Sequence, residues 1–422
     1  MRQLMSKLQS KGYLVKSNKR PVHVSATFIK AKNKCDYLCY LKYLLGLRTI
    51  HDTDPQRYGN RWHTCQEILG RSPGVCTTCA QKAANDPECP FCGGAGFIPE
   101  DRMELVVDYL NKYYAIVPPN KDEVEWLVER AKLMYGMAGY QWYYSESEYE
   151  TLATELEFKL PVVNPRTGRT LPNCKLVGKI DKLVRNQNGV VMIMEHKTTS
   201  SSLDSDSSFW GNLRLNTQIS MYVYAAQQMQ LEGDLIPYGI QPTDPFIQEC
   251  VFDGLRKPGI APKKLSQGDS KEFVETGEYH GKKFEVDYTS CGYTIDGELA
   301  ECEHGKKEGT YTIRETPEMY GMRLLTDMSE RPEFYFGRRE ASRTTQEIED
   351  FQKKIYNIYQ SYKFMCRTET WSKDEDQCEA TYVCEYAGLC YNNVDPAVGD
   401  IPGFKRIFER DKDVNKSTTS SE

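Results

Sequence analysis

The sequence of 422 residues has no apolar run that approaches the ~18 residues of a membrane span. Its first residues also lack the apolar segment of a secretory signal. We therefore expect a cytoplasmic protein with no membrane partner. The chain has no excess of positive charge either, since 54 Lys and Arg face 60 Asp and Glu and the net charge is −6. This balance argues against a simple electrostatic DNA binder.

What the sequence does contain predicts a folded, globular chain. The hydrophobic content is 39%, with 28 Tyr and 15 Phe. Positive charge is concentrated locally, because residues 1–48 hold eleven Lys or Arg and one acid, Asp36. This arm could follow a phosphate backbone, and a solvated tail and helix face explains it equally well.

Two acids and a lysine lie at the ends of a predicted β-hairpin. Residues 175–184 and 190–194 read as strands, and residues 186–189 (Asn-Gln-Asn-Gly) read as the turn. The pairing can bring Asp181 near Glu195, and side chains two positions apart on a strand, such as Glu195 and Lys197, share a face. Such a group can bind Mg²⁺ through oxygen atoms while the lysine steadies a water or a phosphate. A charged sheet without catalytic function is the alternative.

Two predicted helices carry further candidates. Gln218 and Tyr222 lie one turn apart on one helix face downstream of the hairpin. Upstream, His63 follows Gly59 by four residues and is expected at the start of a helix.

In order, these motifs are Gly59-x3-His63, Gly178-x2-Asp181, Glu195-x-Lys197 and Gln218-x3-Tyr222. The set resembles the RecB-type branch of the PD-(D/E)xK nuclease superfamily. Two further segments are similar to that branch, which has a Cys-x2-(Lys/Arg)-aromatic start and a cysteine-rich end. They are residues 39–43, and Cys378, Cys384 and Cys390. The resemblance covers residues 25–390 and implies a restriction-endonuclease-like mixed β-sheet flanked by helices.

The resemblance also implies a reaction, the hydrolysis of DNA with bound Mg²⁺ or Mn²⁺. Asp181, Glu195, His63 and the backbone carbonyl of His196 would hold the ion. Lys197 would stabilise charge electrostatically, and Gln218 and Tyr222 would hold Lys197 and the DNA strand in register. We expect an exonuclease that acts on single-stranded DNA or free ends, with recombination or replication proteins as partners. A DNA-binding assembly subunit that has lost cleavage and a structure- or sequence-specific endonuclease are the alternatives.

Fifteen cysteines in an apparently cytosolic chain indicate metal binding rather than disulfides. Four form a pair of Cys-x2-Cys knuckles, and four thiolates favour structural Zn²⁺. They are Cys76, Cys79, Cys89 and Cys92. The second knuckle is similar to the repeats of the DnaJ-type zinc domain. The segment would be an insertion, either a knob that contacts DNA or a partner, or a stapled surface loop.

Cys378, Cys384 and Cys390 need a fourth cysteine to complete a site. In the resembling nucleases an upstream residue at the place of Cys39 supplies it and a [4Fe-4S] cluster ties the chain ends together. Here the spacing is Cys-x5-Cys-x5-Cys, whereas those nucleases usually show Cys-x2-Cys-x5-Cys. Cys35 or Cys366 could replace Cys39, and zinc or no metal could replace the cluster.

The expected order along the chain begins with a basic arm (1–24), the first helices with Cys39 and His63 (25–70), the zinc insertion (71–100) and a helical subdomain (101–150). The nuclease core (151–264), a polar insertion with strands (265–343), a helix and the cysteine cluster (344–392) and a polar tail (393–422) follow. Within the core, Glu155 or Glu157 could join the site. Arg256 and Lys257 could contact DNA phosphates, although a solvated loop is the simpler explanation.

Overall fold

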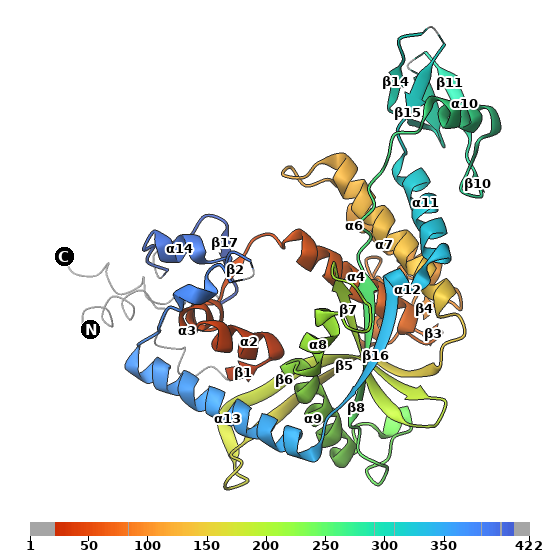
Figure 1. Cartoon of the computed structure of the whole chain (residues 1–422). Helices are drawn as coiled ribbons and strands as arrows, with labels where there is room; N and C mark the ends of the chain where they lie inside the picture. The colour runs from red at the N-terminus through yellow and green to blue at the C-terminus, as the bar shows by residue number, and fades with distance from the viewer. Residues whose placement is uncertain are drawn as a thin grey trace.

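A mixed six-stranded β-sheet lies at the centre of the computed structural model, which describes residues 22–82, 84–290, 292–307, 309–380, 382–396 and 399–408 (Figure 1). Its strands are β1 (Val22–Val24), β5 (Tyr149–Val163), β6 (Thr170–Asn186), β7 (Val191–Thr199), β8 (Glu249–Arg256) and β16 (Phe336–Ser342). The order is β1-β6-β7-β8-β16, and β5 also pairs with β6. The β1–β6 and β7–β8 pairs are parallel, and the other pairs are antiparallel.

The predicted hairpin is β6 and β7. Its turn closes where Gly189 donates its amide to the Asn186 carbonyl at 2.9 Å, with Gly189 at φ +80°. Glycine adopts this left-handed conformation without the steric cost that a side chain would add. The register pairs Lys182 with Met194, so the next position along each strand sets Asp181 opposite Glu195.

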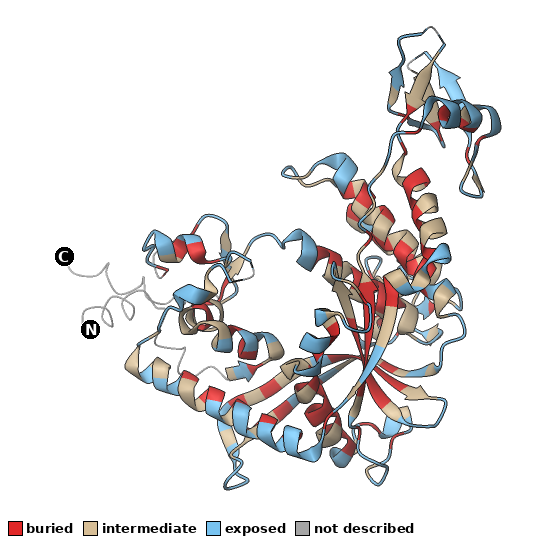
Figure 2. Ribbon diagram, viewed as in Figure 1, coloured by how far each residue is buried: buried red, intermediate tan, exposed pale blue. Residues whose placement is uncertain are grey.

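Helices cover the sheet and bury its apolar side chains (Figure 2). They include α2 (Ala26–Lys34), α8 (Ser208–Arg214), α9 (Thr217–Glu232) and α13 (Thr345–Thr368). The α9 helix packs against β5, β6 and β8, and α13 packs against α9, α2 and β5. A capping box of Thr344 and Glu347 begins α13, in which each residue's side chain satisfies the other's backbone amide.

A second apolar core joins another set of helices with the end of the sheet. They are α4 (Asp54–Gly70), α6 (Met103–Tyr114), α7 (Glu123–Tyr143), α11 (Pro317–Glu330) and α12 (Pro332–Tyr335). The α4 helix begins at a capping box of Thr53 and Gln56 and continues for 17 residues. His63 therefore lies inside the helix, and our expectation that it would lie at a helix start is wrong.

The zinc insertion contains β3 (Gly74–Val75), α5 (Thr77–Gln81) and β4 (Phe97–Ile98). The later polar insertion forms a small lobe with its own apolar core. It extends from the N-terminal end of α11 in Figure 1. This lobe contains α10 (Gln267–Thr276), β9 (Glu278–Tyr279), β10 (Lys282–Lys283), β11 (Val286–Thr289), β12 (Gly292–Ile295), β13 (Glu298–Leu299), β14 (Cys302–His304) and β15 (Tyr311–Ile313). A short 3-10 helix, η3 (Ile236–Tyr238), follows α9.

The two ends of the described chain lie together (Figure 1). They comprise α3 (Asp36–Cys39), the π-helix η2 (Tyr40–Leu44) and β2 (Leu47–Thr49) from the first part, and η4 (Glu375–Gln377), α14 (Ala387–Tyr391) and β17 (Phe404–Arg406) from the last. The β17 strand pairs with β2, so residues 404–406 are not part of a structureless tail. The backbone is extended at Cys35, so α2 ends at Lys34 and α3 begins at Asp36.

The fold class is as predicted, a mixed sheet flanked by helices with a helical subdomain and a four-cysteine cluster. The expected core of residues 151–264 is too narrow, because β1 and β16 complete the sheet from outside it. Phe334 and Tyr335 lie in α12 rather than in the edge strand that follows. Most of the basic arm lies outside the described residues. No helix within the described ranges is both long and apolar enough to cross a membrane.

Candidate active site

Three acidic residues lie in one row across three adjacent strands. Asp181 on β6 has Glu195 opposite it on β7. On the other side, Thr154 pairs with Lys182 and Leu156 with Ile180, so Glu155 on β5 is the residue opposite Asp181. The structure thus brings together Asp181 and Glu195, as the sequence predicts, and adds Glu155 as a neighbour.

Glu155 has an unusual backbone conformation. Its φ is +51° within a long antiparallel strand, and a residue with a side chain occupies this left-handed region only at a cost. One oxygen of Glu155 lies within 4.8 Å of ligand atoms from both His63 and Asp181. Glu157, the alternative in the sequence, is exposed. Strand periodicity puts both acids on one face, so it does not distinguish them.

His63 reaches the row from α4. Its Nδ1 lies 3.2 Å from Oδ2 of Asp181, and the backbone amide of His196 donates to the same oxygen at 3.0 Å. The histidine side chain is about one-third exposed, whereas the Asp181 side chain is 11% exposed. The carboxylates of Asp181 and Glu155 and the imidazole of His63 form a donor set that suits a divalent cation.

Lys197 is held by a chain of hydrogen bonds. Its ammonium contacts Oε1 of Glu195 and donates to Oε1 of Gln218 at 3.1 Å. The Gln218 amide donates in turn to the hydroxyl of Tyr222 at 2.8 Å. The side chain of Asn216 caps α9, because its Oδ1 accepts a hydrogen bond from the backbone amide of Gln218 at 2.8 Å. This bond fixes the first turn of the helix. The structure therefore brings together four side chains of the predicted site: Glu195, Lys197, Gln218 and Tyr222.

Burial and neighbouring charge shift the acids in opposite directions. Burial acts to raise the pKa of Asp181, but the positive charge of His63 outweighs it and the pKa lies below its usual range. Burial and the nearby Asp181 raise the pKa of Glu195 to about 7. Burial acts to lower the pKa of Lys197, but Glu195 and Asp181 outweigh it and raise that pKa. Lys197 is thus held in its charged form.

One atom of the site fits a bound cation directly. Oε2 of Glu195 is buried and has no hydrogen-bond partner among the described residues. A buried carboxylate oxygen without a partner is costly, and a divalent ion between Asp181 and Glu195 would satisfy it.

The sequence profile of the PD-(D/E)XK nuclease superfamily matches residues 23–391. The chain belongs to this superfamily. Membership implies nuclease activity that depends on a divalent metal, with DNA as the substrate. A search of curated proteins finds no match to the chain.

Behind the acidic row, this nuclease has a buried polar cluster that our sequence analysis missed. Nδ1 of His196 lies 2.7 Å from Oδ2 of Asp253, and the Tyr140 hydroxyl donates to the same oxygen at 2.6 Å. The Arg338 guanidinium donates to Oδ1 of Asp253 at 3.0 Å. His196, Asp253 and Arg338 are register partners on three adjacent strands. The sequence offers one sign of this cluster, since Asp253 is an acid within the otherwise apolar strand 251–255. Its partner Arg338, however, lies 85 residues away in the chain.

Removal of the arginine from this cluster should destabilise the protein. In the Arg338→Met variant, Asp253 would remain buried without its cation, and breaking such a pair costs about 3 kcal/mol or more. Arg339→Met is a matched control, because this neighbouring side chain stacks near Trp210 at 5.9 Å instead of binding Asp253. Chemical denaturation should show a loss for Arg338→Met and a change below about 1 kcal/mol for Arg339→Met. Equal losses in the two variants would contradict this account.

The first cysteine group is compact, as the sequence predicts. Sγ of Cys76 lies 3.9 Å from Sγ of Cys89, and Sγ of Cys79 lies 3.5 Å from Sγ of Cys92. All four sulfurs lie within 4.8 Å of one another, and all four residues are buried. Thiolates ~2.3 Å from a tetrahedral ion would be about 3.8 Å apart. The group therefore has the size of a site for one metal ion.

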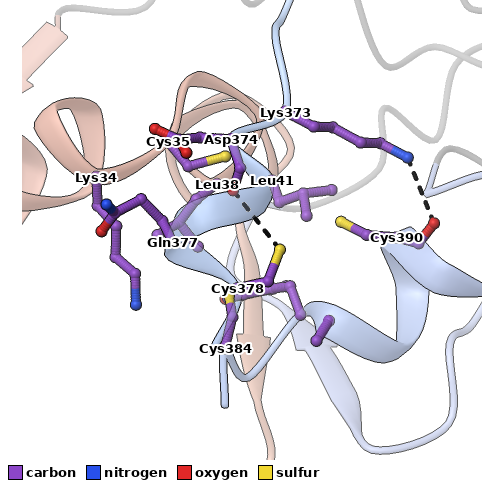
Figure 3. Close-up of a pocket in the computed structure, with 12 residues that line it drawn as sticks. Lys34, Cys35, Leu38, Leu41, Lys373, Asp374, Gln377, Cys378, Cys384 and Cys390 are labelled. Atoms are coloured by element: carbon purple, nitrogen blue, oxygen red, sulfur yellow. Dashed lines mark hydrogen bonds between the residues drawn. The ribbon is translucent and has the colours of Figure 1, made fainter. Parts of the chain in front are cut away.

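The second group differs from the expected one in its upstream member (Figure 3). Cys35, Cys378, Cys384 and Cys390 line one pocket between the two ends of the chain. Cys39 is instead fully buried in the main core and does not line this pocket. The structure therefore places Cys35, and not the expected Cys39, in one pocket with the three downstream cysteines, which makes Cys35 the better candidate for the upstream ligand.

The two basic candidates at the end of β8, Arg256 within the strand and Lys257 directly after it, contact aromatic rings. The Arg256 guanidinium lies 3.9 Å from the ring centroid of Phe334, and the Lys257 ammonium lies 5.0 Å from that of Tyr58. Lys257 also donates its backbone amide to the Thr199 carbonyl at the end of β7 at 2.7 Å. Both residues thus lie beside the end of β7, the strand that carries Lys197, and their contact with DNA remains a prediction.

Proposed function

We propose that this protein is a metal-dependent DNA exonuclease that hydrolyses phosphodiester bonds from the ends of single-stranded or unwound DNA. The observation that carries the proposal is the position of Asp181 and Glu195, each directly next to the Lys182–Met194 pair of the hairpin, beside a lysine fixed by Gln218. Oε2 of Glu195 is buried and has no partner among the described residues. This combination supplies oxygen ligands and a fixed positive charge at one place.

Asp181, Glu195, His63 and the carbonyl of His196 would hold Mg²⁺ or Mn²⁺. When bound, the ion would polarise the phosphate and lower the pKa of a water ligand. Lys197 stabilises negative charge that develops on the phosphate, since its ammonium is fixed by Glu195 and Gln218. Tyr222 holds the Gln218 amide and so maintains the direction of the lysine side chain.

The RecB-type subtype is supported by the order of its four motifs, all of which meet at this site. His63 comes from α4, Asp181 and Lys197 come from the sheet, and Gln218 and Tyr222 come from α9. Single-strand exonucleases are common in that branch.

Two structural metal sites accompany the proposed active site. The compact group of Cys76, Cys79, Cys89 and Cys92 would bind Zn²⁺, because four buried thiolates leave no open coordination position. The second group would bind a [4Fe-4S] cluster. Its sulfurs, in the part of the chain that the structure describes, are not all within 4.8 Å of one another, whereas those of the compact group are, and a wider arrangement suits a multi-atom cluster better.

Linear and circular single-stranded DNA of the same sequence test the exonuclease directly. With Mn²⁺, we expect complete degradation of the linear form and an intact circle, because only the former has ends. The circle is then cut once with an unrelated endonuclease, and we expect it to become a substrate. Cleavage of the intact circle at a comparable rate would instead indicate an endonuclease on the same fold.

A further inference from the structure

The acidic row has the outline of a site for two ions. The β6 strand lies between β5 and β7, so Asp181 has Glu155 on one side and Glu195 on the other. Adjacent strands lie ~4.8 Å apart, and paired ions in enzymes lie ~3.5–4 Å apart. One ion could therefore lie between Asp181 and Glu195, and a second between Asp181 and Glu155.

Each outer carboxylate, however, already has an ammonium beside it. Lys197 contacts Glu195, and Nζ of Lys179 lies 2.6 Å from Oε2 of Glu155. Lys179 lies two residues before Asp181 on β6, opposite Glu157 on β5, so its side chain reaches diagonally across to Glu155.

The two halves of the row differ in what remains unsatisfied. In the Glu195 half, Lys197 binds Oε1 of Glu195, and Oε2 is buried and has no partner within the described ranges. In the Glu155 half, Lys179 binds Oε2 of Glu155, and His63 also lies on this side, with a ligand atom within 4.8 Å of those of Asp181 and Glu155. Among the three acids of the row, the buried carboxylate oxygen that lacks a partner in the described part of the chain therefore belongs to Glu195.

The charge of the row also favours one ion. With His63 neutral, as a histidine that binds a metal is, three ionised carboxylates and two ammonium groups leave a net charge of about −1, which one divalent ion more than neutralises. A second divalent ion would add two further positive charges beside Lys179, and like charges this close in a partly buried site repel strongly.

We propose that the row holds one divalent ion, between Asp181 and Glu195, and that the Lys179 ammonium takes the place of a second ion beside Glu155. This inference deepens the proposed nuclease function and rests on it. The strained backbone of Glu155 then serves to bring its carboxylate to Lys179 and Asp181.

The number of bound Mn²⁺ ions, measured by electron paramagnetic resonance during titration of the purified full-length protein, tests the proposal without an activity assay. Mn²⁺ prefers oxygen ligands to thiolates, so the cysteine groups should not contribute. We expect one ion per wild-type chain and two per Lys179→Met chain. Lys179→Arg keeps the charge and should bind one. Glu155→Gln and the Lys179→Met/Glu155→Gln double variant should also bind one.

Three results would overturn the inference: two ions in the wild type, one ion in Lys179→Met, or loss of the ion in Glu155→Gln, which would put it in the other half. Asp181→Asn measures the background, which should be close to zero. Absence of any bound Mn²⁺ in the wild type would overturn the proposed function as well, which separates that failure from the other three. The Lys179 side chain is 43% exposed, so its replacement should leave the fold intact, and circular dichroism checks this.

Discussion

Lys197→Ala should lose Mn²⁺-dependent degradation of linear DNA by about 10³-fold while DNA binding persists. Loss of a fixed electrostatic group at a reaction centre typically costs 10²–10³-fold in rate. Lys197 meets the requirement for such a group, because Glu195 and Gln218 fix its ammonium and the neighbouring acids keep it charged. Asp181→Asn should have an effect at least as large, since Asp181 is the acid shared by His63 and the β7 backbone.

The assay should measure cleavage and binding on the same oligonucleotide. Lys159→Ala is a suitable control, because Lys159 is an exposed lysine on β5 outside the acidic row. It should cleave at close to the wild-type rate. If Lys197→Ala and Asp181→Asn also cleaved at that rate, the assignment of this site would be wrong. If both variants lost DNA binding together with cleavage, the electrostatic role of Lys197 would not be separable from substrate affinity.

Local sequence patterns were sufficient to predict the centre of the site. Asp181, Glu195 and Lys197 lie on one hairpin, whose register depends on a short turn and on alternating side chains. Gln218 and Tyr222 are related by one helical turn, and a single hydrogen bond confirms their spacing. In each case the geometry depends on residues close together in the chain.

Features that depend on backbone irregularity or distant strands were not predictable in this way. Glu155 is distinguished from Glu157 by a left-handed backbone, which alternation alone does not reveal. Asp253 obtains its cation from β16 through long-range strand pairing, so no local pattern links the two. The position of His63 within α4 follows from a helix start at Thr53, where a capping box and Pro55 outweigh the glycine at position 59.

The cysteine set illustrates the same limit. In one continuous helix, Cys35 and Cys39 would be one turn apart on the same face, so helical periodicity cannot choose between them. The backbone is extended at Cys35, with φ −166° and ψ 129°, and α3 begins after it. This break places Cys35 in the pocket with the downstream cysteines and leaves Cys39 in the core.

The pair Cys35→Ala and Cys39→Ala therefore gives the second large expected effect. Protein purified without oxygen should be brown, with a broad visible absorbance band and about four iron atoms per chain. Cys35→Ala should lose most of the iron and the colour, because the cluster loses its only ligand from the first part of the chain. Cys39→Ala should keep both and lose only about 1 kcal/mol of stability, as expected for a small cavity in the core.

Zinc provides an internal reference for this comparison, because the compact group of Cys76, Cys79, Cys89 and Cys92 is separate from the cluster pocket. Both variants should retain about one zinc ion per chain. Loss of iron in Cys39→Ala with retention in Cys35→Ala would restore Cys39 as the upstream ligand. Two zinc ions and no iron in the wild type would exclude the cluster. A metal bound through Cys35 would join α3 to the segment around α14, so Cys35→Ala should also make the chain ends more sensitive to proteolysis than Cys39→Ala does.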